Sequence, residues 1–343
     1  MTSVRNRRII LSSRPESLPT EANYSMTEAE VPVPGEGGVL ARILMLSIDP
    51  AMRGWVLETP NYAPPVPVGD VMRSFGVAEV VESKSSKYQV GDIVTAMTGW
   101  QEWCVLTDDN IQRRVDPSHA PISTSLGVLG VTGITAYVGM VEIGKPTAGS
   151  TAVVSTAAGS VGSAAGQLAA LHGARAVGLT GSDQKVRMCL DEFGFDAAIN
   201  YKTSRNLAVD LAAACPDGID VYFDSVGGEM LDAVLENVTI GARIAICGTI
   251  SMLANEIPMG RRIERKLLVQ RALMQGYLAS DHYDRAEDIA SKMAQWIQSG
   301  QLKYREEISP RLEDAPAALV RMLEGENLGK SAVRVAFGRA ETN

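Results

Sequence analysis

A glycine-rich turn follows a short apolar strand at residues 157–162 of the 343-residue chain. Ala157, Gly159 and Gly162 occupy the three glycine positions of the G-x-G-x-x-G fingerprint, with alanine in the first. Small residues let backbone N–H groups approach a pyrophosphate, which then lies at the positive end of a helix beginning near Ser160. Small residues also allow close packing of a helix, so the motif alone is weak evidence for dinucleotide binding. With a strand before it and a helix and second strand after it, the turn predicts dinucleotide binding.

The end of the second strand indicates which dinucleotide is bound. An NAD site usually has Asp or Glu there, about 20 residues after the fingerprint, to bond the ribose 2′-hydroxyl. Here the strand ends at Thr180 and Gly181, and Asp183 follows only in the first helical turn. Lys185 lies in the same turn, where the helix dipole disfavours a cation unless a phosphate lies beside it. We expect NADPH, with its 2′-phosphate near Ser182 and Lys185; the alternative for Lys185 is a solvated surface lysine.

The type of reaction is inferred from chemistry that the sequence lacks. An enzyme that reduces an isolated carbonyl must stabilise an alkoxide, usually with zinc or an acid such as a Tyr-x-x-x-Lys pair. None of the nine tyrosines has a lysine four residues later. None of the three histidines lies near the early strands that would carry a metal. Hydride addition to an enone is less demanding, because a few donors can hold the enolate. Tyr62, on a proline-stiffened loop, is a candidate proton donor to the α-carbon; the alternative is an ordinary loop aromatic.

Charge and composition exclude several other classes. The chain has 32 basic and 40 acidic residues, a net charge of −8, so its surface as a whole should repel nucleic acid and anionic lipid. Four dispersed cysteines and no CxxC pair argue against a zinc finger or a disulfide framework. No segment approaches 18 apolar residues, and the N-terminal apolar run is too short for a signal peptide. We therefore expect a cytoplasmic protein whose partner is a small molecule.

Two patterns of elements divide the chain, as its length predicts. Up to about residue 125, short strands alternate with turns, at 39–48, 76–82, 93–98 and 103–106. Residues 58–70 have four prolines in eight positions and predict an extended, stiff loop. From about residue 127, strands alternate with helices, which is typical of a parallel sheet with helices on both faces. The expected strands are 151–155, 176–180, 197–200, 220–223 and 243–247; the expected helices are 160–172, 182–193, 206–214 and 228–237. A helix near 314–324 and a strand at 331–337 end the pattern.

A series of motifs in one order resembles a known family along nearly the whole chain. The motifs are RNRR (5–8), LSIDPAMRG (46–54), NYAPPVPVGDVM (61–72), GWQEW (99–103), LGVLGVTGITAY (126–137), AAGSVGSAAGQLA (157–169), FGFDAAINYK (193–202), DSVGG (224–228), CGTIS (247–251), MQGY (274–277) and GENLGK (325–330). They are similar to those of the zinc-independent medium-chain reductases, which include prostaglandin reductases, plant alkenal double-bond reductases and bacterial curcumin reductase. Such a series is far more specific than one glycine motif.

The resemblance implies an α/β protein of two domains. A GroES-like, mostly β substrate domain spans residues 1–126 and is completed by 312–343, and a Rossmann domain with a doubly wound parallel sheet spans 127–311. The active site is expected in the cleft between them, and relatives are often homodimers joined through their cofactor domains. Zinc-dependent cousins would have cysteine near Ser47 and histidine near Asp70, so the resemblance agrees with a site without metal.

The resemblance also implies which residues bind NADPH and substrate. Tyr62 falls on the family tyrosine near the substrate, and the pyrophosphate lies at the glycine turn. The resemblance places Lys185 and Tyr201 at the 2′-phosphate. Ser182 is added to them because of its position at the end of the second strand. The full set for the cofactor is Gly159, Ser160, Val161, Gly162, Ser163, Ser182, Lys185, Tyr201, Ser225, Cys247, Gly248, Thr249, Ile250, Ser251, Tyr277, Leu278, Ala279 and Asn327, with the 247–251 loop continuing to Leu253.

Four positions depart from the family pattern. Ala51 and Leu253 stand where the family usually has tyrosines, Thr132 replaces a proline, and Ser225 replaces an asparagine. The loss of two aromatic hydroxyls predicts a roomier and more apolar pocket, with Tyr62 as the main donor. The expected activity is NADPH-dependent reduction of the carbon–carbon double bond of α,β-unsaturated ketones and aldehydes. The alternatives are NADPH-dependent quinone reduction, or a non-catalytic NADP-binding sensor or structural protein.

Overall fold

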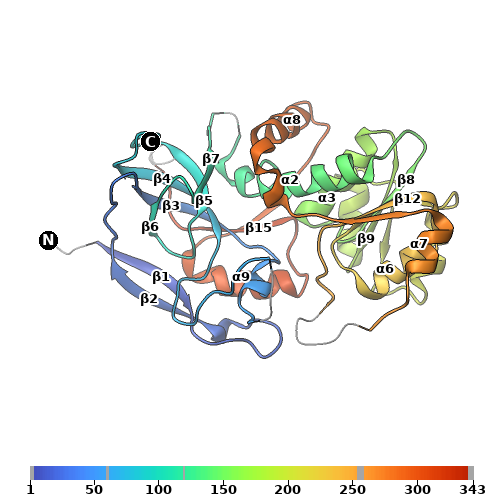
Figure 1. The fold of residues 1–343 in the computed structure, drawn as a ribbon, viewed down its shortest axis with the longest axis horizontal. Coiled ribbons are helices and arrows are strands. Elements are labelled where there is room, and N and C mark those ends of the chain that lie inside the picture. The colour runs from blue at the N-terminus through green and yellow to red at the C-terminus, as the bar shows by residue number, and fades with distance from the viewer. Residues whose placement is uncertain (1–3, 59–61, 119, 253–258, 339–343) are drawn as a thin grey trace. The chain divides into compact units, whose positions relative to one another are not determined.

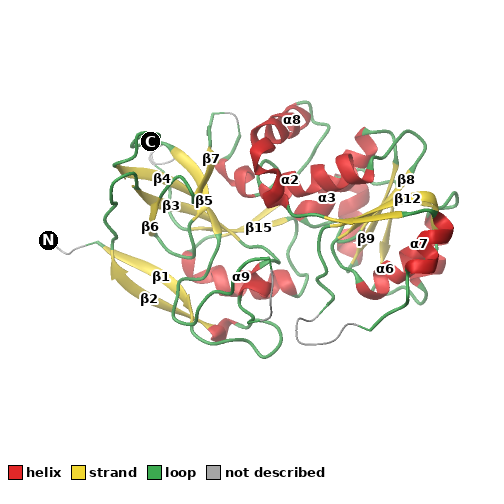
Figure 2. Ribbon diagram, in the orientation of Figure 1, coloured by secondary structure: helices red, strands yellow, loops and turns green. Residues whose placement is uncertain are grey.

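The computed structural model describes residues 4–58, 62–118, 120–252 and 259–338 of the protein. The chain forms two compact units, one of residues 1–127 with 306–343 and the other of residues 128–305. Figure 1 traces the chain through both units, and Figure 2 distinguishes their helices from their strands. Among the described residues, no helix is both long and apolar enough to cross a lipid bilayer.

The N-terminal unit is built mainly of antiparallel strands. β1 (Arg5–Leu11) and β2 (Tyr24–Glu30) form a two-stranded ribbon. Its larger sheet has the order β14-β15-β3-β4-β5-β7, with β6 also paired to β3. The strands are β3 (Val39–Ser47), β4 (Phe75–Ser83), β5 (Ile93–Met97), β6 (Trp103–Leu106), β7 (Ile111–Arg114), β14 (Glu306–Ser309) and β15 (Lys330–Arg334). The helices α1 (Met52–Trp55) and α9 (Ala315–Leu323) pack their apolar residues into the same core.

The second unit is a parallel sheet in which strands alternate with helices. Its order is β10-β9-β8-β11-β12-β13, and every pair along it is parallel. The strands are β8 (Thr151–Val154), β9 (Arg175–Thr180), β10 (Ala197–Asn200), β11 (Ile219–Asp224), β12 (Val238–Ile246) and β13 (Leu273–Gly276). The helices are α2 (Val131–Tyr137), α3 (Ser160–Leu171), α4 (Asp183–Arg187), α5 (Leu207–Ala214), α6 (Gly228–Leu235), α7 (Glu264–Gln270) and α8 (Ala286–Gln298).

Burial of apolar side chains on the sheet explains these helices. Leu211 of α5 and Val234 of α6 are fully buried in one cluster with Val153, Val177 and Tyr222 of the sheet. Figure 1 shows α3 on the opposite side of the strands from α6. Strand order reverses between β8 and β11, whose helices lead to opposite sides, so their carboxyl ends define the usual ligand position of such a sheet.

The predicted two-part α/β architecture is confirmed, although several elements were missed. The predicted strands correspond to β3–β6, β8–β12 and β15, and the predicted helices to α3, α5, α6 and α9. The helix expected at 182–193 is shorter: α4 ends at Arg187, and a wider π-helical turn (Met188–Glu192) follows it. The sequence pattern did not predict β1, β2, β7, β13, β14, α1, α2 or α8.

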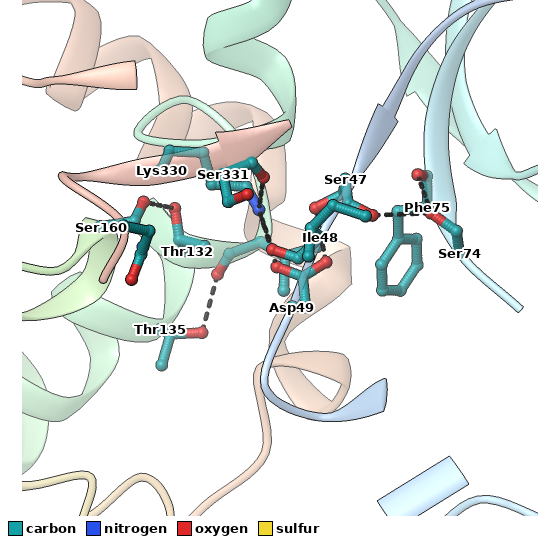
Figure 3. Close-up of polar contacts among 12 residues, drawn as sticks. Ser47, Ile48, Asp49, Ser74, Phe75, Thr132, Thr135, Ser160, Lys330 and Ser331 are labelled. Atoms are coloured by element: carbon teal, nitrogen blue, oxygen red, sulfur yellow. Dashed lines mark hydrogen bonds and ion pairs between the residues drawn. The ribbon is translucent and has the colours of Figure 1, made fainter. Parts of the chain in front are cut away.

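A buried ammonium group joins β15 to the end of β3. Lys330 is 3% exposed, and its Nζ donates to the carbonyls of Ile48 (2.8 Å) and Ser331 (2.9 Å) and to Asp49 Oδ1 (2.9 Å). Ser47 Oγ donates to the other oxygen of Asp49 at 2.5 Å. Figure 3 shows these residues converging on the ammonium. Since an ammonium has three N–H donors, all three have acceptors, which is the condition for burying a charge.

Lys330→Met keeps the aliphatic stem but should destabilise the protein. It leaves the Asp49 carboxylate and two carbonyls without this donor, and breaking a buried ion pair costs about 3–5 kcal/mol. The measurement is the midpoint of urea unfolding. The matched control is Lys87→Met, which removes an ion pair between Lys87 and Asp108 whose side chains are 65% and 45% exposed, and should shift the midpoint much less. Equal shifts for both variants would contradict this assignment.

Candidate functional site

The glycine-rich turn places five of the predicted cofactor residues at the start of α3. Thr156 has a positive φ of 49°, and its carbonyl accepts the N–H of Gly159 at 2.8 Å. A Cβ at Gly162 would lie 2.3 Å from that carbonyl oxygen, so only glycine fits there. The first N–H groups of a helix have no intrahelical acceptor, and no side chain caps this helix end. Gly159, Ser160, Val161, Gly162 and Ser163 therefore form a turn with donors suited to an anion.

Several polar residues meet where β9 ends. Ser182 is the N-cap of α4, and its Oγ accepts the N–H of Lys185 at 3.3 Å. Asp183 accepts the side-chain amide of Asn200 at 2.8 Å, so its carboxylate is engaged beside the strand. A Cβ at Gly181 would lie 3.2 Å from the Tyr201 hydroxyl, which places that hydroxyl against the strand end. Ser182, Lys185 and Tyr201 are thus brought to the end of β9, and their role at a 2′-phosphate stays a prediction.

Asp224 organises the carboxyl ends of β11 and β12. Its side chain has no exposed surface, and Oδ1 accepts the N–H groups of Val226 and Gly227, both at 2.9 Å, and the hydroxyl of Tyr222 at 3.0 Å. Its carbonyl accepts the N–H of Cys247 at 2.7 Å. Burial raises the pKa of this carboxyl, against the lowering effect of its three hydrogen bonds.

The predicted loop after β12 lies along the residues that follow Asp224. Ile250 and Ser251 donate their N–H groups to the carbonyls of Ser225 (3.2 Å) and Val226 (3.1 Å). The N–H of Ser225 in turn donates to Ser155 Oγ at 2.8 Å, which ties the end of β8 to the same point. The loop residues Cys247, Gly248, Thr249, Ile250 and Ser251 are thus brought to the carboxyl edge of the sheet, whereas Leu253 lies outside the described residues.

Tyr277 follows β13 and anchors the segment that continues through Leu278 and Ala279. Its hydroxyl donates to the Thr135 carbonyl at 2.7 Å. A Cβ at Gly139 would lie 2.1 Å from that hydroxyl, so the glycine makes room for it. Burial raises the pKa of Tyr277 above its ordinary value and that of Cys247 to about 11, so both groups are neutral near pH 7.

Two predicted residues belong to the N-terminal unit, and their roles stay predictions. Tyr62 is 58% exposed, and the segment after it is held where Val66 donates its N–H to the Trp55 carbonyl at 2.7 Å. Arg73 donates to the Pro64 carbonyl at 2.8 Å. Asn327 donates from its side-chain amide to the Gly329 carbonyl at 2.9 Å.

The structure adds three residues that the sequence did not indicate. The stem of Lys202 lies beside Gly181, where a Cβ would be 3.3 Å from it, which adds a second lysine near the end of β9. Thr132 pairs with Ser160, and Asp224 shapes the turn after β11. Lys202 follows Tyr201 directly and could have been found from that position. The pairing of Thr132 and Ser160 spans 28 residues and has no local signal.

Comparisons with known proteins agree with these features. Residues 7–113 match the family model described as the N-terminal domain of oxidoreductase, and residues 160–298 match the one described as zinc-binding dehydrogenase. The chain is 41% identical to the NADPH-dependent curcumin reductase of Escherichia coli over 338 residues, which cover 97% of each protein. It is 37% identical to the NADP-dependent 2-alkenal reductase of Nicotiana tabacum over 337 residues, 97% of this chain and 98% of the relative.

A solved structure of CurA from Vibrio vulnificus in complex with NADPH is also similar, with a TM-score of 0.90 and 39% identity over 96% of this chain and 99% of that one. The chain therefore belongs to the zinc-independent medium-chain dehydrogenase/reductase family. Within it, the chain is an NADP-dependent oxidoreductase of the group that includes the curcumin, 2-alkenal and prostaglandin reductases. The predicted family, enzyme class and cofactor are confirmed.

The donor set does not fit the zinc named in the second family description. Ser47, at the expected cysteine position, donates its hydroxyl to Asp49. Asp70, at the expected histidine position, is exposed. Among the described residues, which leave out His119, no group of three or more His, Cys, Asp or Glu side chains could hold a metal ion. No catalytic step is therefore assigned to a metal.

Asp224→Asn should remove a pH dependence of the free energy of unfolding. It should keep the turn, because the amide oxygen can still accept the hydrogen bonds of Asp224 Oδ1. A carboxyl whose pKa is raised by folding binds more protons in the folded state, so wild-type stability falls as pH rises from about 4 through the folded pKa. The stability of wild type relative to Asp224→Asn should therefore decrease across that range in urea unfolding of the cofactor-free protein.

Asp224→Ala is the control, because it leaves the N–H groups of Val226 and Gly227 without this acceptor. It should lower stability at every pH, by about 1–3 kcal/mol for each buried group left unpaired. If wild type instead gains stability relative to Asp224→Asn as pH rises, the three donors outweigh the cost of burial.

Proposed function

We propose that this protein reduces the carbon–carbon double bond of α,β-unsaturated ketones and aldehydes with NADPH, as a 2-alkenal and 2-alkenone reductase. The observation that carries the proposal is the similarity to a curcumin reductase and a 2-alkenal reductase over 97% of the chain. The phosphate-suited residues at the end of β9 support NADPH as the reductant. When bound, NADPH supplies the hydride that reduces the β-carbon.

The residues of the parallel-sheet unit hold and orient the cofactor in this proposal. The N–H groups at the start of α3 bind the pyrophosphate, and Ser182, Lys185 and Tyr201 bind the 2′-phosphate. The hydrogen bonds of Asp224 and Tyr277 keep their segments at fixed positions along the carboxyl edge. Since Cys247 and Tyr277 are neutral, they add no charge that would compete with the enolate.

Tyr62 is the proposed proton donor to the α-carbon, and water is the alternative. A phenol is a suitable donor to an enolate because it is protonated near pH 7. Ala51 supplies only a methyl group where the family resemblance places a tyrosine. We therefore propose a pocket that favours apolar enones over those that need additional hydrogen bonds.

We also propose a homodimer formed through the outer edge of β13, which pairs with no other strand among the described residues. This strand ends the six-stranded sheet, and an exposed sheet edge can pair with a second copy. Leu273 of β13 is 40% exposed, and Leu268 and Val269 of α7, which precedes the strand in the chain, are 75% and 50% exposed, which supports coverage by an apolar partner. Sedimentation velocity of the intact chain distinguishes a dimer from a monomer.

The decisive assay is anaerobic NADPH consumption with a panel of simple enones and enals. We expect turnover with these substrates, and Tyr62→Phe should lower kcat at least about ten-fold while leaving the Kd for NADPH nearly unchanged. Tyr88→Phe removes a tyrosine hydroxyl from the same unit and is the matched control.

No turnover across the panel would refute the proposed function, and NADPH oxidation with quinones alone would replace it with quinone reduction. Tight NADPH binding without any turnover would favour a sensor. An unaltered rate in Tyr62→Phe would assign proton donation to water and leave the overall reaction in place.

Lys185→Ala should narrow the preference for NADPH over NADH. The lost charge-assisted hydrogen bond to the 2′-phosphate corresponds to about 1–3 kcal/mol in the ratio of the two Kd values. Both values are measured by quenching of protein fluorescence. Arg187→Ala, on the exposed side of the same helix, should leave the ratio unchanged. An unchanged ratio in Lys185→Ala would remove Lys185 from the phosphate site.

A further inference from the structure

Two hydroxyl groups meet between the first turns of α2 and α3. Thr132 Oγ1 and Ser160 Oγ lie 2.9 Å apart, and Figure 3 shows the two side chains facing each other. Thr132 is the second residue of α2 and is 7% exposed, whereas Ser160 is the first residue of α3 and is partly exposed. The pair therefore has a buried member and a member that reaches the surface at the proposed pyrophosphate site.

The number of protons limits how this pair can bind a phosphate. Each hydroxyl has one proton to donate, and either oxygen can accept. If Ser160 donates to Thr132, its own lone pairs are directed at the ligand. If Thr132 donates to Ser160, the proton of Ser160 is left for the ligand. Since phosphate oxygens at neutral pH only accept, the second arrangement is the one compatible with a bound pyrophosphate.

The surroundings of Ser160 also favour a hydrogen bond in which Thr132 donates and Ser160 accepts. The N–H groups at the start of α3 already direct donors and a positive partial charge to this point, and no side chain caps them. A hydroxyl that accepts one hydrogen bond becomes a stronger donor in the next, because the two bonds polarise each other. Thr132 therefore makes Ser160 a better phosphate donor without touching the ligand itself.

We infer that Thr132 is a cofactor-positioning residue, which donates to Ser160 and so directs the Ser160 hydroxyl proton to the pyrophosphate of NADPH. This inference rests on the proposed placement of the pyrophosphate at the start of α3. Thr132 stands where the family resemblance places a proline, a residue without a hydroxyl. The hydroxyl pair is thus a contribution of this chain beyond the backbone donors of the glycine turn.

Thr132→Val tests the inference because valine has nearly the same shape without the hydroxyl. We expect the Kd for NADPH to rise about three- to ten-fold, the scale of one lost hydrogen bond. Thr132→Ser retains the hydroxyl and should restore most of the affinity. The Kd for 2′-AMP, which has the adenosine and 2′-phosphate but no pyrophosphate, should be the same in wild type and Thr132→Val. All values come from equilibrium fluorescence titration without substrate.

A double-mutant cycle shows whether Thr132 acts through Ser160. Ser160→Ala should weaken NADPH binding to a similar extent, and adding Thr132→Val to Ser160→Ala should weaken it no further. Thr239→Val is the matched control: it removes a hydroxyl that donates to Asp220 Oδ1 at 2.7 Å, near the start of β12, and should leave both Kd values unchanged. Thermal unfolding of each cofactor-free variant reports whether its fold is intact.

Three results would overturn the inference: an unchanged NADPH Kd in Thr132→Val, equal weakening of 2′-AMP and NADPH, or additive losses in the double variant. If Thr132→Val does not fold, an unchanged NADPH Kd in Ser160→Ala overturns it by itself. Failure of the proposed function is distinct, because the wild-type protein would then turn over no enone or would not bind NADPH.

Discussion

The buried carboxylate of Asp224 is the constraint on which the carboxyl edge of the parallel sheet depends. One oxygen fixes the turn that leaves β11, while the backbone carbonyl of the same residue holds the start of the segment that leaves β12. Two neighbouring strand ends thus share one anchor, and Ser155 brings the end of β8 to it through Ser225. Burying a carboxylate is unfavourable, so the shape of the edge is obtained at the expense of stability.

The N-terminal unit uses a charge of the opposite sign in a comparable way. Lys330 is satisfied by two carbonyls and one carboxylate, and it connects strands that are 281 residues apart at the Asp49 contact. A buried ion has few alternative partners, so it specifies one register between β15 and β3 more strictly than apolar side chains can. In both units the hydrogen bonds of one buried charged residue determine where loops begin.

Features with a local signal could be predicted from the sequence. The turn between β8 and α3 combines apolar strand residues, small residues and a helix, and its prediction needed no distant contact. By contrast, α2 contains β-branched residues and Gly133, which disfavour a helix, and it becomes helical where it packs on α3 and α8. β13, with the sequence Leu-Met-Gln-Gly, has no β-branched residue and is a strand because β12 pairs with it.

The same distinction applies to the site. Gly159, Gly162, Ser182 and Lys185 stand at fixed offsets from strand and helix ends, so their positions could be anticipated. Asp224 and Thr132 could not be recognised, because the role of each depends on which backbone groups or hydroxyls the folded chain brings to it. The resemblance to a family supplied Tyr201, Tyr277 and Asn327, which composition and spacing alone would not have selected.

In the sequence, the second unit interrupts the N-terminal unit, and this affects the order of folding during synthesis. Residues 128–305 are continuous, so the parallel sheet can form as soon as that stretch has left the ribosome. The sheet of the N-terminal unit cannot be completed then, because β15 lies between β14 and β3 and is made only after residues 128–305. Until Lys330 has been synthesised, the edge of β3 that pairs with β15 and the Asp49 carboxylate are exposed to water. A nascent chain therefore carries a finished parallel-sheet unit and an open β-sheet at the same time.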